Sequence, residues 1–222
     1  MPRAFFARPA EAVAPELIGS ILLHDTPEGL VAGRLVEVEA YDGEADRASH
    51  ARAGRTARTA TMYGPPGHAY VYLVYGLHDC LNVVTEADGK AGAVLVRAAA
   101  PLAGETLMRT RRAARGAPSR EPPQRLASGP ARLTQAFGVD RRLDGADLTR
   151  GPLRLVAADA WPLSPPAMLV AATPRVGVAY AGEPWASIPW RFVAAGDPAV
   201  SRRAAGTIGR DGRSIDRDPR VP

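Results

Sequence analysis

Cysteine is nearly missing from this sequence. Cys80 is the one cysteine among 222 residues, which excludes a disulfide framework and argues strongly against a cysteine-based zinc site. The four histidines show no metal-ligand spacing, so we expect neither a metal nor any other cofactor. A chain with a single thiol suits a reducing compartment, and we expect a cytoplasmic protein, associated with the nucleoid if its source is bacterial.

Long apolar runs are also missing. No run approaches the roughly 20 residues that a membrane-spanning helix needs, and the first residues lack the unbroken apolar stretch of a signal peptide. Hydrophobic residues still make up 46% of the chain, which is typical of a globular protein, and the length suits one sizeable core. We expect a single domain over residues 1–200, with a mobile loop near 116–124, and an Arg- and Gly-rich tail over 201–222.

Lysine is scarce as well, so the basic side chains are almost all arginine. Lys90 is the only lysine among 28 basic residues, and the formal net charge is +5. Guanidinium groups match phosphate in a bidentate fashion, which favours a nucleic-acid partner. A solvated basic surface and the codon bias of a GC-rich genome explain the same composition, and charge alone does not separate these interpretations.

Strand patterns dominate the chain, and helical patterns are few. The predicted strands are 21–24, 30–41, 68–75, 81–85, 93–98, 153–157, 175–179 and 190–193. The predicted helices are 11–19, 105–115 and 130–137, the last capped by Ser128 and ended by Gly138. Since no strand–helix–strand rhythm is present, we predict an α+β fold: a single domain with a curved, mostly antiparallel sheet flanked by a few helices.

Two carboxylates share one face of the strand predicted over 30–41. Period-two alternation places Val36 and Val38 on one face and the following residues on the other: Leu35, Glu37, Glu39 and Tyr41. By itself this pattern is more often a solvated glutamate beside a core ring than a functional pair.

Tyrosines and arginines follow this strand closely. Four of the six tyrosines fall within 63–75, and the polar loop over 42–68 carries Arg52, Arg55 and Arg58. Rings beside a basic loop are what a protein needs to stack an unpaired base and to contact phosphate. Ordinary cross-strand tyrosine pairs and a solvated loop are the alternatives.

Taken together, these segments closely resemble the alkyladenine (3-methyladenine) DNA glycosylase family. The resemblance rests on 33–43 (GRLVEVEAYDG), 46–50 (DRASH), 61–76 (TMYGPPGHAYVYLVYG) and 80–82 (CLN), and continues through 95–97, 128–130 and 175–177. It covers residues from about 15 to 200 in order, while the loop over 116–124 and the tail lie outside it. The family's fold, a mixed domain around a curved antiparallel sheet, agrees with the prediction made from the residues.

The resemblance implies an enzyme of base-excision repair without a cofactor. Such an enzyme flips alkylated or deaminated purines (3-methyladenine, hypoxanthine and ethenoadenine types) from double-stranded DNA and hydrolyses the N-glycosidic bond. Glu39 matches the family's general base, which deprotonates the attacking water, and Arg97 matches the arginine that helps to hold that water. We expect a monomer that acts on damaged duplex DNA and not at a membrane.

The resemblance also assigns the residues that handle the base. Tyr41, His50 and Tyr72 match the pocket residues that sandwich the flipped base. Tyr75 matches the wedge that fills the vacated stack, and Asn82 matches the side chain that disfavours the exocyclic amine of guanine.

Three other functions stay open. A glycosylase that also cuts the strand needs an amine, and the chain offers Lys90 and an N-terminal amine, which could become that of Pro2. Because glycosylases that use an N-terminal proline carry zinc-finger cysteines, we expect a monofunctional enzyme. The remaining alternatives are a catalytically inactive DNA-binding relative and a small-molecule hydrolase with a basic surface.

Overall fold

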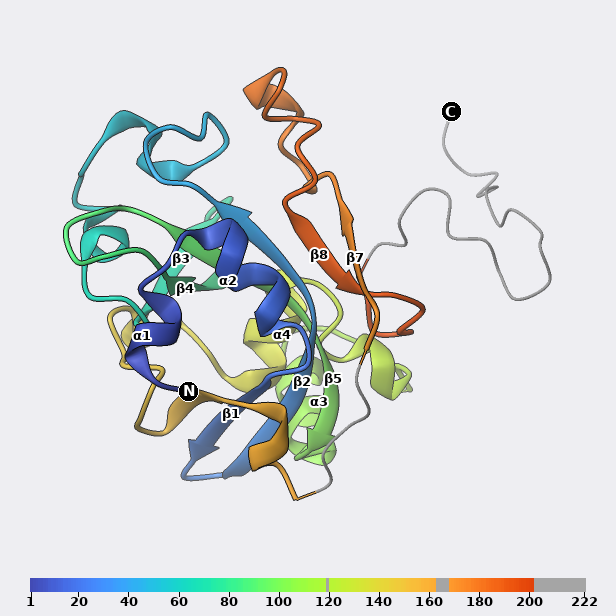
Figure 1. Ribbon diagram of the computed structural model, residues 1–222. Helices are drawn as coiled ribbons and strands as arrows, with labels where there is room; N and C mark the ends of the chain where they lie inside the picture. Colours follow the sequence, from blue (N-terminus) through green and yellow to red (C-terminus); the bar gives the residue numbers. More distant parts are fainter. Residues whose placement is uncertain (119, 163–167, 202–222) are drawn as a thin grey trace, which may run out of the picture.

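Strands form the framework of the computed structural model, which describes residues 1–118, 120–162 and 168–201 (Figure 1). The strands are β1 (Ile21–Thr26), β2 (Gly29–Tyr41), β3 (Ala69–Val74), β4 (His78–Val84), β5 (Ala93–Ala103), β6 (Leu153–Val156), β7 (Val170–Thr173) and β8 (Arg191–Ala194). They form one eight-stranded sheet with the order β3-β4-β5-β2-β1-β6, and β8 pairs with β2 and β7. All of these pairs are antiparallel, so the predicted α+β fold is confirmed.

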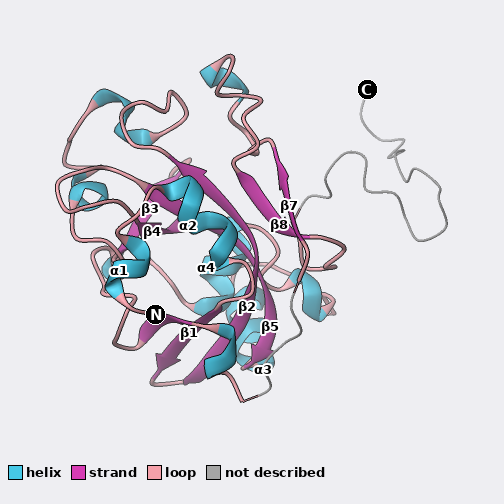
Figure 2. Cartoon of the chain, viewed as in Figure 1, coloured by secondary structure: helices cyan, strands magenta, loops and turns pink. Residues whose placement is uncertain are grey.

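The α-helices are short, and the shorter helical turns lie in the loops (Figure 2). The α-helices are α1 (Arg3–Phe6), α2 (Ala10–Leu17), α3 (Glu105–Ala113) and α4 (Pro130–Phe137). The 3-10 helices are η1 (His50–Ala53), η2 (Ala60–Tyr63), η3 (Pro123–Arg125), η4 (Arg141–Leu143), η5 (Ala158–Ala160) and η6 (Ala179–Ala181). Within the described ranges, no helix has the length and apolar character needed to cross a bilayer.

One face of the sheet carries the hydrophobic core. Val38 of β2, Val94 and Val96 of β5 and the buried faces of all four α-helices belong to the same apolar cluster. Because side chains alternate along a strand, the residues between these valines point to the opposite face. That opposite face is therefore available for polar chemistry.

A bulge in β2 sets which residues reach that polar face. Leu35 lies opposite Ala99 and Glu37 lies opposite Ala98, so two residues of β2 face one of β5 at Val36. Leu35 therefore packs in the main core with Val38, while Val36 packs in a separate cluster. The simple alternation was wrong at this point: Leu35 does not share a face with Glu37 and Glu39.

β2 also changes partners at the bulge. Its first part pairs with β1 through Arg34, and its later part pairs with β8 from Glu37 to Glu39. The sheet thus forks around β2, and the loop before β8 rises at the top of the molecule beside the loop that follows β2 (Figure 1). These two loops flank the end of the strand that carries Glu39.

Two local predictions were wrong. The strand predicted over 175–179 is absent from the described residues; β7 ends at Thr173, because Pro174 lacks the N–H that a ladder needs and Gly177 has a left-handed φ of 79°. Ser128 does not cap α4: it forms a β-bridge with Ala98, and Gly129 occupies the cap position.

The segment over 116–124 is joined to α3 and α4 through one buried side chain. Glu121 contacts Arg112 of α3 at 3.1 Å and Arg132 of α4 at 3.2 Å. Mobility of this loop stays a prediction. The tail predicted over 201–222 lies, apart from Ser201, outside the described residues.

Candidate active site

A row of residues crosses the polar face of the sheet. Tyr70 of β3 lies opposite Asn82 of β4, Asn82 lies opposite Leu95 of β5, and Leu95 lies opposite Glu39 of β2. Residues directly opposite each other in antiparallel strands project to the same side. Pairing alone therefore places Asn82 and Glu39 on one surface. Tyr72 follows Tyr70 by two residues and Arg97 follows Leu95 by two residues, so both share that surface.

Glu39 is fully buried and is held by three donors. The Tyr41 hydroxyl donates to Oε2 at 2.9 Å, the backbone N–H of Val176 donates to Oε1 at 2.7 Å, and Arg97 Nη1 donates to Oε2 at 3.3 Å. Glu39 has no accessible surface. Three donors from three different segments fix the position of both carboxylate oxygens, as a positioned base requires.

Arg97 is held in turn by Glu37, a residue to which the sequence analysis assigned no role. Glu37 Oε1 accepts from Arg97 Nε at 2.7 Å and from Arg191 Nε at 2.8 Å, and Oε2 accepts from the N–H of Ser201 at 2.7 Å. Burial alone would raise the pKa of Glu37, but the two arginines outweigh it and the pKa is lowered. Two carboxylates and two guanidinium groups thus form a balanced buried quartet.

Aromatic residues gather beside this quartet. The His50 and Tyr72 rings lie 4.4 Å apart between centroids at an angle of 80°, and His50 Nδ1 lies 3.1 Å from the Tyr70 hydroxyl. Tyr41 is half-buried; its pKa is raised first by burial and then by the nearby Glu39 and Tyr72. The structure therefore brings together Glu39, Arg97, Tyr41, His50 and Tyr72.

His50 is a neutral ring at physiological pH. Burial lowers its pKa to about 4, with further contributions from Arg58 and Arg52. A neutral imidazole lets the site accept a positively charged ligand without repulsion.

Asn82 and Tyr75 occupy different environments. Asn82 is 4% exposed, and its Nδ2 donates to the Tyr70 carbonyl at 3.0 Å, which orients the amide. Tyr75 stands at the tip of the β3–β4 hairpin with 89% of its surface exposed. Its φ is 52° and that of Gly76 is 69°, and Leu77 N–H donates to the Val74 carbonyl at 3.1 Å. This is a type I′ turn with a bulky residue in a conformation that favours glycine.

Arginines of the loop over 42–68 lie on aromatic rings. The guanidinium carbon of Arg58 is 5.5 Å from the Tyr72 centroid, and those of Arg55 and Arg52 are 5.9 Å from Tyr63 and 5.7 Å from Tyr180. The loop is joined to the loop before β8 by the Tyr180 hydroxyl, which donates to the Ala48 carbonyl at 2.9 Å.

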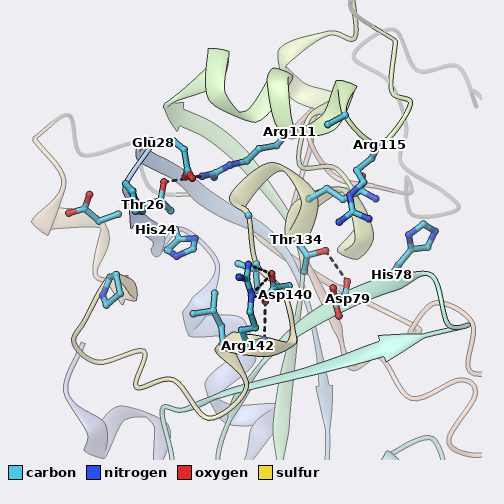
Figure 3. A pocket seen from close by; sticks show the side chains of 18 of the residues that line it. His24, Thr26, Glu28, His78, Asp79, Arg111, Arg115, Thr134, Asp140 and Arg142 are labelled. Carbon is cyan, nitrogen blue, oxygen red and sulfur yellow. Dashed lines mark hydrogen bonds and ion pairs between the residues drawn. The ribbon is translucent and has the colours of Figure 1, made fainter.

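A groove of about 770 Å³ lies elsewhere, between the β1–β2 turn, the ends of α3 and α4 and the turn end of the β3–β4 hairpin (Figure 3). None of the predicted site residues lines it. Four of its charged side chains form ion pairs within the groove: Arg111 with Glu28 at 2.9 Å, and Arg142 with Asp140 at 2.7 Å. The groove is therefore distinct from the cluster around Glu39.

The chain is similar to known proteins along most of its length. The sequence model of the methylpurine-DNA glycosylase (MPG) family matches residues 4–198. A protein of Methanocella arvoryzae named "Putative 3-methyladenine DNA glycosylase" is 46% identical over 208 residues, which cover 94% of this chain and 98% of that protein. Proteins of the same name from Streptomyces avermitilis and Leifsonia xyli subsp. xyli are 46% and 48% identical, covering 93% and 89% of this chain and the same shares of their own.

Proposed function

The chain belongs to the methylpurine-DNA glycosylase family, and from this premise we propose that it hydrolyses the N-glycosidic bond of damaged purines in double-stranded DNA with a water activated by Glu39. The family assignment makes it a DNA glycosylase, a hydrolase of base-excision repair. The observation that supports the catalytic role is a buried Glu39 carboxylate fixed by donors from Tyr41, Val176 and Arg97.

In the proposed reaction, Glu39 accepts a proton from water as the water oxygen bonds to the sugar C1′. The bond from C1′ to the purine nitrogen breaks, and its electron pair leaves with the base. The carboxylate also stabilises the positive charge that develops on the sugar. Arg97 holds Glu39 and the water in place, and Glu37 keeps Arg97 turned toward them.

The proposed pocket reads the flipped base by stacking. Tyr41, His50 and Tyr72 supply rings beside Glu39, and a ring face attracts a cationic alkylpurine by about 0.5–2 kcal/mol. Asn82 lies in the same row of the sheet, where its amide would disfavour the amine of guanine. Alkylated and deaminated purines are the substrates we propose, the protein acting as a cytoplasmic monomer.

Release of free base from a panel of duplexes tests this proposal. We expect 3-methyladenine, hypoxanthine and ethenoadenine to be released and undamaged purines to be retained. Duplex affinity that falls steeply with salt, together with base release, would separate this function from that of a small-molecule hydrolase. Lesion binding without release of any base would instead indicate an inactive DNA-binding relative.

Tyr75 is proposed to fill the space that the flipped base leaves. Replacing it by glycine should stabilise the protein by about 1 kcal/mol, because the left-handed conformation that costs a tyrosine suits glycine. The same change should weaken binding to a lesion duplex, because the wedge is lost. Thermal unfolding and duplex titration measure the two effects, and Leu77→Ala, which alters the neighbouring exposed side chain, is the stability control. A Tyr75→Gly protein that binds as tightly as the wild type would contradict the wedge role, and one that loses stability would contradict the proposed cost of the left-handed conformation.

We propose a monofunctional enzyme, in which water is the only nucleophile. The Lys90 amine is held 3.0 Å from Glu86, and the N-terminal amine donates to the Leu155 carbonyl at 3.1 Å, so both amines have partners. Borohydride added during the reaction should trap no protein–DNA adduct, since no Schiff base forms. An adduct lost in Lys90→Gln, or one that persists in that variant and maps to the N-terminus, would establish the lyase alternative.

A further inference from the structure

A buried ion pair lies behind one ring of the proposed pocket. The side chains of Asp46 and Arg175 have no exposed surface. Arg175 Nη1 contacts Asp46 Oδ2, and Nη2 donates to Oδ1 at 3.0 Å. Arg175 also donates to the carbonyls of Ala40 at 2.9 Å and Trp185 at 3.2 Å. This network fixes the guanidinium plane between the end of β2 and the loop before β8.

The guanidinium group covers one face of Tyr41. Its carbon lies over the Tyr41 ring, 4.7 Å from the centroid, and over the Trp190 ring, 5.1 Å from the centroid. Because Arg175 is fully buried while Tyr41 is half-buried, the accessible part of the tyrosine lies on the ring's other face and edge. A base stacked on Tyr41 therefore has a cation on the far side of the same ring.

An unpaired cation at that position would oppose a positively charged base. A stacked base lies about 3.5 Å from the ring, which puts its centre roughly 8 Å from the guanidinium carbon. Like charges at that distance repel each other substantially inside a protein. The bidentate Asp46 carboxylate cancels the charge of Arg175 and leaves its support of the ring intact.

We propose that Asp46 sets the specificity of the pocket for cationic purines by neutralising Arg175 behind Tyr41. The inference rests on the proposed function, because it concerns the substrates of the same pocket. Asp46 and Arg175 act through Tyr41 and do not touch the base, so they are positioning residues. Their effect should appear as a difference in affinity between duplexes that carry a charged base and duplexes that carry a neutral base of the same shape.

The test compares the affinity of the full-length protein for two uncleavable duplexes. One carries a 2′-fluoro-7-methylguanine nucleotide, which is cationic at mildly acidic pH. The other carries 7-methyl-7-deazaguanine, a neutral base of the same shape. The ratio of the two dissociation constants, cationic over neutral, does not depend on the fraction of folded protein. Asp46→Asn should raise this ratio about tenfold through the unpaired arginine.

Two further variants complete the test. Arg175→Met should lower the ratio, because it leaves the carboxylate behind the ring, and the double variant should restore the wild-type ratio. If Asp46→Asn does not fold, the direction of change in Arg175→Met decides. Equal ratios in all folded variants would overturn the inference and indicate a purely structural ion pair. Base release by the wild type from a cleavable duplex tests the proposed function separately, so the two failures are distinguishable.

Discussion

Replacing Glu39 by glutamine should lower the rate of base release about 10²–10⁴-fold, the usual contribution of a positioned general base. Glutamine keeps the size of the side chain and can still accept from Val176, but it cannot take a proton from water. The fold should survive, because Arg97 keeps its 2.7 Å bond to Glu37. Single-turnover release of base, with enzyme in excess over a lesion duplex, measures the effect.

The loss of base release can be assigned to the hydrolysis step only if the Glu39→Gln protein still binds the lesion duplex. Titration of a lesion duplex should give an affinity close to that of the wild type, since Tyr41, His50 and Tyr72 are unchanged. Glu16→Gln is the matched control: Glu16 is exposed and, among the residues that the structure describes, forms its ion pair with Arg8, at 3.0 Å. A Glu39→Gln enzyme that releases base at the wild-type rate would remove Glu39 from the mechanism.

Replacing Glu37 by glutamine should damage both stability and catalysis. Removing one partner of a buried ion pair costs about 3–5 kcal/mol, and here Arg97 and Arg191 would be left with Glu39 as the remaining carboxylate of the quartet. For a chain of this size each kcal/mol corresponds to about 2–4 °C in the melting temperature. Base release should also fall, because Arg97 then lacks the Glu37 carboxylate that keeps it turned toward Glu39 and the water.

The pH dependence of stability separates the charge of Glu37 from its shape. Its folded-state pKa is lowered below the ordinary value of 4.5, so the stabilisation is present above that value and is lost as the pH falls through the folded-state pKa. The melting temperature of the wild type should therefore drop more steeply in acid than that of Glu37→Gln. Glu37→Asp, which keeps the charge on a shorter side chain, should follow the wild type. Parallel acid profiles for all three proteins would argue against this role of Glu37.

Much of the sheet could be predicted from the sequence, because local alternation and turn residues define strands such as β2 and β3. The resemblance also named side chains that the structure brings together around Glu39. Pairing register explains why Asn82 and Glu39 share a surface, and register depends on partners far along the chain. The bulge at Val36 was missed for the same reason: it exists only relative to β5.

The contacts that complete the site join residues that lie far apart in the sequence, and local sequence patterns do not predict which of them meet. In the sequence, Glu37 is not distinguished from other strand carboxylates. Its partners Arg191 and Ser201 are brought to it because β8 pairs with β2. Arg175 was assigned to a strand, whereas its side chain turns inward to meet Asp46 from a loop. An arginine in a polar segment does not reveal whether it faces solvent or a buried carboxylate.

Beyond the bulge at Val36, the face that each residue of β2 occupies depends on the number of residues in the strand. A residue inserted or deleted in the turn before Gly29 leaves Glu39 opposite Leu95. The same change between Val36 and Glu39 rotates the carboxylate into the apolar side of the sheet and brings a valine to the reacting face. Insertions and deletions among relatives should therefore occur in the loops and not in this stretch. The number of residues between Val36 and Glu39 should be conserved as strictly as their identity.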